Sequence, residues 1–214
     1  MVKRILNPIH LVIGATGAIA FLLLLIRVKQ SQSVFLLFLI WNLFLAYVPL
    51  IISNVITYFK LKKFSLPMSL IGWLLFLPNA PYIITDFIHL HKSSTFFWLD
   101  AFSIGFFALS GFLAGIFSLI QIQYYLQAYL SKRFINIITW IISFASGFGI
   151  YLGRFLRWNS WDILQHPLAL IKDILRIIIQ PHTHQLAWGV TVGFGGLFIF
   201  CYVLLYNSVQ PKKE

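Results

Sequence analysis

Long uninterrupted apolar stretches recur six times along the chain. A helix needs about 20 mostly apolar residues to cross a bilayer, where its backbone groups must be satisfied internally. The stretches do not show the short alternation of apolar and polar positions typical of transmembrane β-strands. The pattern predicts an all-α polytopic transmembrane bundle of about six spans, forming one integral membrane domain over residues 1–214. The expected spans are Leu11–Ile26, Val34–Phe59, Phe64–Thr85, Ala101–Leu130, Phe134–Leu152 and Leu186–Tyr206.

The third apolar stretch contains two prolines and an asparagine in the sequence FLPNAPYIITDFIHLHK, residues 76–92. Pro78 and Pro81 each remove a backbone donor and crowd the preceding turn, so they predict a break in the third helix near residues 77–80. Asn79 is suited to cap a new helix that begins at Ala80. Irregular backbone at membrane depth is tolerated where it lines a cavity or is buried in protein. The break therefore favours a cavity wall.

Titratable side chains follow this break at helical spacing. Tyr82, Asp86 and His89 would share one face of the new helix, with Thr85 beside them. Ionisable groups inside spans are candidates for function, whereas those at span ends often mark the emergence of the chain into water. Both interpretations fit the sequence, because prolines also kink many ordinary membrane helices.

A second polar segment, GRFLRWNSWDILQHP, ends the fifth apolar stretch at residues 153–167. Arg154 and Arg157 are three residues apart and would share a helix face. Asn159 and Asp162 have the spacing of a capping box, which predicts the start of a new helix. Arginines and tryptophans at a span end are also ordinary interface anchors.

Topology places the two polar segments on the same side of the membrane, since two crossings separate them. Asp86, His89, Arg154, Arg157 and Asp162 could therefore meet in one site. A buried aspartate needs a cationic partner, and either arginine would serve. An arginine pair also binds phosphate or carboxylate in a bidentate manner.

Residues 166–180 predict an amphipathic helix that is too short and too charged in its middle to cross the bilayer. Pro167 suits its first turn, and Lys172, Asp173 and Arg176 fall on one face. We expect this helix to lie in the membrane interface, with a groove against the bundle as the alternative.

Composition supports the membrane assignment, because 60% of the residues are hydrophobic and only 10% are charged. The net charge of +11 arises from loop residues without a basic stripe, so it does not indicate nucleic-acid binding. Nine basic residues fall on the side of the termini and seven on the other, which favours cytoplasmic termini. The first apolar run is expected to be retained as a helix, because its small residues precede the leucines.

The segments LPNAPYIITDFIHL and GRFLRWNSWD resemble the two signature segments of an uncharacterised bacterial membrane-protein family, domain of unknown function 1361. The resemblance extends over nearly the whole chain. It implies a multi-pass protein of the bacterial cytoplasmic membrane and no particular activity. It also favours one shared polar site over two independent interface anchors.

Three classes of function fit these features. The first is an enzyme or binding protein for an anionic, phosphorylated or lipid-linked substrate at the extracytoplasmic face. In this hypothesis the catalytic candidates are Asp86, His89 and Asp162, and the substrate-binding candidates are Asn79, Tyr82, Arg154, Arg157 and Asn159. The second class is a small transporter or channel subunit, and the third is a non-catalytic membrane partner with a structural salt-bridge cluster. The histidine spacing matches no strong metal signature, so no metal is assigned, and cofactors and oligomeric state stay open.

Overall fold

The computed structural model describes residues 2–92 and 95–209, with side chains described for residues 8–90 and 95–208. In these ranges six helical segments are long and apolar enough to cross a membrane, which confirms the predicted polytopic bundle. The elements are α1 (Val2–Ser31), η1 (Phe35–Leu37), α2 (Phe38–Phe59), α3 (Ser65–Phe76), α4 (Asn79–Tyr82), η2 (Ile83–Lys92), α5 (Phe97–Leu126), α6 (Lys132–Arg154), α7 (Asp162–Gln165), α8 (Pro167–Ile179) and α9 (Gln185–Val209).

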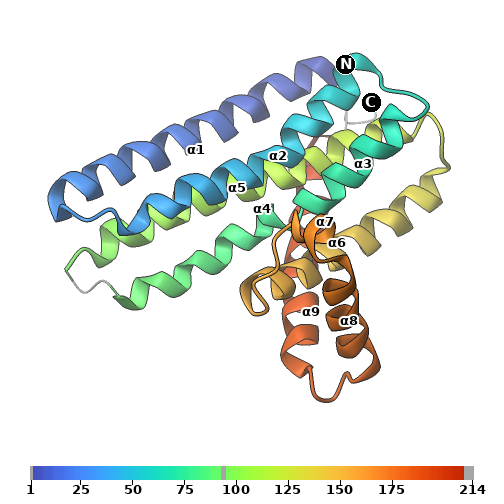
Figure 1. Ribbon diagram of the computed structural model, residues 1–214. Coiled ribbons are helices and arrows are strands. Elements are labelled where there is room, and N and C mark those ends of the chain that lie inside the picture. The colour runs from blue at the N-terminus through green and yellow to red at the C-terminus, as the bar shows by residue number, and fades with distance from the viewer. Residues whose placement is uncertain (1, 93–94, 210–214) are drawn as a thin grey trace.

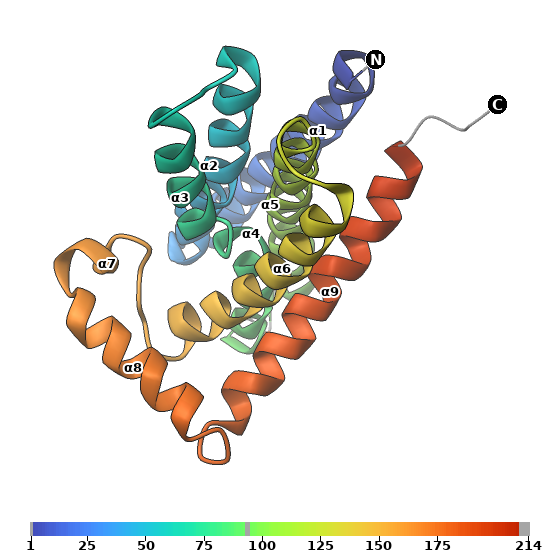
Figure 2. The ribbon, with the colours of Figure 1, turned by 90° about the vertical axis from the view of Figure 1, so that its right-hand side faces the viewer.

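Helix α5 is the centre of the bundle. In its most apolar window 78% of the residues are buried, compared with 22–39% for the other five spans. Helices α1 and α2 pack along α5, and α6 and α9 form a separate packed pair that crosses them (Figures 1 and 2). The central helix carries polar side chains that are satisfied by its neighbours, for example Ser110, which donates to the Ile13 carbonyl of α1, and Gln121, which accepts from Ser53 of α2.

The third span is broken, as the prolines predict. It runs from Ser65 to Leu90 as the α-helix α3, the single turn α4 and the 3₁₀ helix η2. The expected capping role of Asn79 is wrong, since its side chain donates to the Phe76 carbonyl at 2.9 Å and caps no helix N-terminus. The α-helix expected from Ala80 through His89 is also wrong. Pro78 and Pro81, three residues apart, have no backbone N–H and so remove two hydrogen bonds of an α-helix. The segment continues as the more tightly wound 3₁₀ helix η2.

Two glycine pairs allow this broken span to approach its neighbours closely. On α5, a Cβ at Gly115 would clash with the Cβ of Ala80. On α6, a Cβ at Gly149 would lie 2.7 Å from Pro78. Gly111 and Gly153 continue the same two faces against Ile83 and Tyr82. The segment that contains the prolines is therefore inserted between α5 and α6 at backbone distance, which is how small residues promote helix association in lipid.

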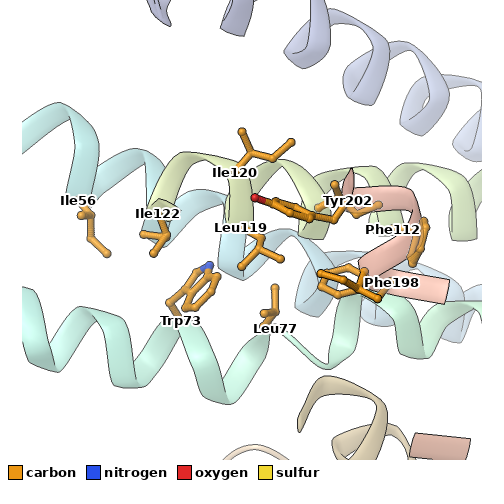
Figure 3. Packing of buried hydrophobic residues seen from close by; sticks show 11 residues of the cluster. Ile56, Trp73, Leu77, Phe112, Leu119, Ile120, Ile122, Phe198 and Tyr202 are labelled. Atoms are coloured by element: carbon orange, nitrogen blue, oxygen red, sulfur yellow. The ribbon is translucent and has the colours of Figure 1, made fainter. Parts of the chain in front are cut away.

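A hydrophobic cluster fixes α3 beneath the central helix (Figure 3). Trp73 and Leu77 of α3 are almost fully buried there, at 1% and 0% exposure. The indole N–H of Trp73 donates to Ser118 of α5 at 3.1 Å, so the ring carries no unsatisfied donor. The other labelled members of the cluster are Ile56, Phe112, Leu119, Ile120, Ile122, Phe198 and Tyr202.

The amphipathic helix expected before the last span is confirmed as α8, with Pro167 at its first position. Ile177 is buried against α6 and α9, where Tyr151 and Ala187 belong to the same cluster. Leu168 and Ile179 are 81% and 72% exposed. One stripe of α8 thus contacts the bundle while other apolar residues face outward.

We predict different responses to alanine at two helical glycines, one closely packed on α5 and one with open space around it on α9. Gly115→Ala should lower the free energy of unfolding by about 1–3 kcal/mol, because the new methyl group overpacks the contact with Ala80. Gly193→Ala should leave it unchanged or raise it, because nothing lies within 4 Å of that Cβ and alanine favours the helix. Denaturant unfolding in mixed micelles measures both. Equal responses would contradict the close packing of α4 on α5.

Candidate functional site

A buried ion pair joins the two polar segments predicted from the sequence. Asp86 of η2 is fully buried, and one of its carboxylate oxygens accepts from Nη2 of Arg154, at the end of α6, at 2.9 Å. The other oxygen accepts from Nδ2 of Asn42, on α2, at 2.7 Å. Both oxygens are therefore satisfied, which is what an aspartate at this depth requires. The expectation that Asp86 and an arginine of the second segment meet is confirmed.

Tyr82 completes the surroundings of the Arg154 guanidinium. Nη1 of Arg154 donates to the Tyr82 hydroxyl at 3.3 Å, and the guanidinium carbon lies 5.0 Å from the centre of the tyrosine ring. This cation–π contact adds to the ion pair. Nε of Arg154 is buried and has no hydrogen-bond partner among the described residues. The positive charge of Arg154 is balanced by Asp86, so this arginine is already paired within the chain.

The chain folds back toward α3 after α6 ends. The Ser160 hydroxyl donates to the Leu75 carbonyl at 2.9 Å and accepts from the Asn79 amide at 3.3 Å. Leu75 is among the last residues of α3, whose carbonyls have no donor within the helix. The non-helical turn of residues 155–161 is thus tied to the break in the third span, as irregular backbone inside a membrane protein must be.

A cavity of about 300 Å³ lies between α2, the third span, α6 and this turn. Among the described residues its lining contains amides, hydroxyls and indoles but no Asp, Glu, Lys or Arg. Trp41 and Leu74 are 54% and 41% exposed, so the cavity reaches the surface of the bundle. Its polar and aromatic lining residues are Trp41, Asn42, Asn79, Tyr82, Ser146, Trp158, Asn159, Ser160 and Trp161.

Two lining residues are held by the ion pair directly. Asn42 bonds to Asp86 and Tyr82 bonds to Arg154, yet neither Asp86 nor Arg154 belongs to the lining. The pair therefore lies behind the cavity wall and orients its polar groups. The cavity thus has a polar wall with a buried ion pair behind it.

The remaining predicted residues have different surroundings. Asp162 accepts from the backbone N–H of Asn159 at 2.6 Å, which is one of the two bonds of the predicted capping box, but the short helix α7 begins only at Asp162. Arg157 is exposed and adopts a left-handed conformation with φ 62° in the turn. His89 packs edge-to-face on Phe38, with ring centres 4.9 Å apart, and on Phe35 at 5.9 Å. The described contacts thus bring Asp86, Arg154 and Tyr82 together, with Asn79 and Asn159 along the neighbouring cavity.

Sequence reasoning missed one residue that contacts the Asp86 carboxylate and a second buried ion pair elsewhere in the bundle. Asn42 is an amide within the apolar first half of its span, residues 35–46, and that placement was the signal available for it. The second is a buried ion pair between Arg27 of α1 and Asp100 of α5, whose second contact measures 3.3 Å. The guanidinium of Arg27 also lies over Phe96, 4.8 Å from the ring centre. Among the described residues no group of three or more His, Cys, Asp or Glu side chains could hold a metal ion.

A family model described as "Protein of unknown function (DUF1361)" matches residues 41–201. This match covers both polar segments and the whole cavity lining. The chain belongs to the DUF1361 family. No curated protein and no solved structure matches the chain. The geometry of this DUF1361 protein is therefore the main basis for a proposal about its function.

The ion pair of the DUF1361 protein should behave as a coupled unit. Asp86→Ala and Arg154→Ala should each lower the free energy of unfolding by about 3–5 kcal/mol, because each leaves a buried charge without its partner. The double variant should cost less than the sum of the two, by about 0.5–3 kcal/mol. Unfolding in mixed micelles measures the cycle.

Arg157→Ala is the matched control, since Arg157 is an exposed arginine only three residues from Arg154. We expect it to change the free energy of unfolding by less than about 0.5 kcal/mol. Strictly additive effects of Asp86→Ala and Arg154→Ala would show that the two side chains are not coupled.

Proposed function

We propose that this protein binds the polar head of an amphipathic, lipid-linked molecule in the cavity between α2, the third span and α6. The observation that carries the proposal is a surface-reaching cavity whose polar wall residues Asn42 and Tyr82 are oriented by a buried ion pair. A purely structural ion pair has no need of a cavity beside it. Binding sites in general combine a mostly apolar hollow with a few polar groups held in fixed positions.

The chemistry of the lining narrows the ligand. An anion inside the cavity would be desolvated without a cation to pair with, which is costly. Amide and hydroxyl groups beside indole rings suit a neutral, hydroxyl-rich group such as a sugar or polyol. We therefore assign the neutral part of the head group to the cavity. A phosphate, expected from the arginines in the sequence, would lie outside it, where Arg157 is exposed.

The surroundings of the cavity fit a ligand that arrives from lipid. Trp41, Leu74 and Ile163 line the cavity and are 54%, 41% and 38% exposed. A lipid-linked head group could enter between these side chains while its tail stays in the bilayer. We infer that the protein lies in the bacterial cytoplasmic membrane with cytoplasmic termini, because basic residues prevail at that end. The cavity then opens toward the extracytoplasmic half.

The contacts support binding more directly than catalysis. Asp86 is buried and bonded to Asn42 and Arg154, so we assign it the positioning of the cavity wall. The catalytic roles expected for Asp86, His89 and Asp162 stay predictions. Acid–base chemistry would need one of these groups to reach the ligand, and none of the three is part of the lining.

The cavity can be tested by filling it from an exposed position. Ala145 of α6 lines the cavity and is exposed, so Ala145→Phe should fill the hollow without disturbing the core. Ile141→Phe is the matched control, because Ile141 lies on the same helix, is 61% exposed and is outside the lining. The probe is dodecyl maltoside, added below its micellar concentration to the protein in lipid nanodiscs.

Tryptophan fluorescence measures binding, since Trp41, Trp158 and Trp161 line the cavity. We expect saturable quenching or enhancement by dodecyl maltoside in the unchanged protein and in Ile141→Phe. In Ala145→Phe the saturable phase should weaken at least tenfold. Equal binding by both variants would contradict the assignment of the ligand to this cavity.

The position of the charge gives a separate prediction. Dodecyl phosphate should bind more weakly than dodecyl maltoside in the same assay, because the lining offers no cation. A probe that carries both groups, a dodecyl phosphosugar, should bind more tightly than dodecyl maltoside, and Arg157→Gln should remove this gain. Preferential binding of dodecyl phosphate that survives Arg157→Gln would place an anion inside the cavity and contradict the neutral-head proposal.

A further inference from the structure

Basic side chains gather at the end of the bundle opposite the polar site. The turn between α2 and α3 carries Lys60, Lys62 and Lys63, all exposed. The turn before α6 leads into Lys132 and Arg133, the first two residues of that helix, which are also exposed. Both turns lie at the end of the bundle where α1 begins and α9 ends (Figure 1). None of the acidic residues in the described ranges belongs to either turn, since they are Asp86, Asp100, Asp162 and Asp173.

The turn after α2 holds its lysines in an unusual backbone conformation. Lys60 and Lys63 have φ values of 49° and 51°, in the left-handed region that favours glycine and asparagine. An L-residue with a long side chain costs about 1 kcal/mol there. The chain nonetheless places a lysine at both positions. Tyr125 of α5 fixes the turn by donating to the Leu61 carbonyl at 2.6 Å.

Exposed aromatic side chains locate these lysines relative to the bilayer. Tyr58, Phe59 and Phe64 flank them and are 77%, 66% and 93% exposed. Aromatic rings of this kind are favoured at the level of the lipid head groups. The lysine side chains therefore project at the depth where phosphate groups of phospholipids lie. Each basic residue near an anionic leaflet contributes about 1 kcal/mol of attraction.

We propose that Lys60, Lys62 and Lys63 form a binding site for the head groups of anionic phospholipids. The site is separate from the cavity and does not depend on the proposed function, since it lies at the opposite end of the bundle. Three cations on one fixed turn, without a neighbouring carboxylate among the described residues, pair with phosphate as point charges. Lys132 and Arg133 extend the same basic end of the bundle.

The test uses the full protein in detergent and removes the charge without disturbing the turn. Asparagine tolerates the left-handed conformation, so the variant Lys60→Asn/Lys62→Gln/Lys63→Asn keeps the backbone and loses three charges. The matched control is Lys172→Gln/Arg176→Gln, which neutralises two exposed cations of α8, away from the turn between α2 and α3. The probes are dioleoyl phosphatidylglycerol and, as the zwitterionic reference, dioleoyl phosphatidylcholine.

Native mass spectrometry counts bound lipid, and melting in detergent measures the stabilisation that each lipid confers. We expect the unchanged protein and the α8 control to prefer phosphatidylglycerol at least fivefold, and the turn variant to lose most of this preference. Inorganic phosphate at millimolar concentration should not displace the lipid. Equal preference in all three proteins would overturn the proposal. Full displacement by phosphate would also overturn it, because the turn would then be a site for free phosphate.

Discussion

A carboxylate buried within a span is the constraint on which the rest of this structure depends. Asp86 is fully buried, so its charge is stable only if both carboxylate oxygens accept hydrogen bonds from donors inside the protein. Asn42 supplies one donor from α2 and Arg154 supplies the other from α6. These bonds bring three spans to one point. Helix α6 ends at this arginine, and the turn that follows is tied to the third span through Ser160.

The cavity follows from this convergence. A straight third span would pack continuously against α2 and α6 and would leave no polar hollow. Pro78 and Pro81 interrupt it, and the glycines of α5 and α6 admit the interrupted segment at backbone distance. Ser160 then caps the freed Leu75 carbonyl from outside. The backbone groups left free by the irregular segments are thus satisfied by side chains that also line the cavity.

Much of the fold could be predicted from the sequence, because bilayer thickness sets a minimum length for the apolar run of each span. A single polar residue does not hide a run of that length. The six spans, the break at the prolines, the helix α8 and the meeting of Asp86 with Arg154 all follow from apolar run length, proline chemistry and the parity of crossings. The winding of η2, the return of residues 155–161 to α3 and the donor role of Asn42 do not. They depend on how helices cross and which carbonyls become exposed, and neither property is encoded in local spacing. The pairing of Arg27 with Asp100 was within reach, since topology puts both on one side, but nothing local marks them as partners.

That second ion pair has a consequence for how the bundle is assembled. Arg27 precedes Asp100 by 73 residues, so during synthesis the first span carries a cation whose partner does not yet exist. Until α5 emerges, the guanidinium must keep contact with water at the membrane surface. The arrival of Asp100 removes that need and lets α1 settle along the central helix. Burial of the Arg27 side chain is thereby linked to the start of the fourth span, because Asp100 lies in its first turn.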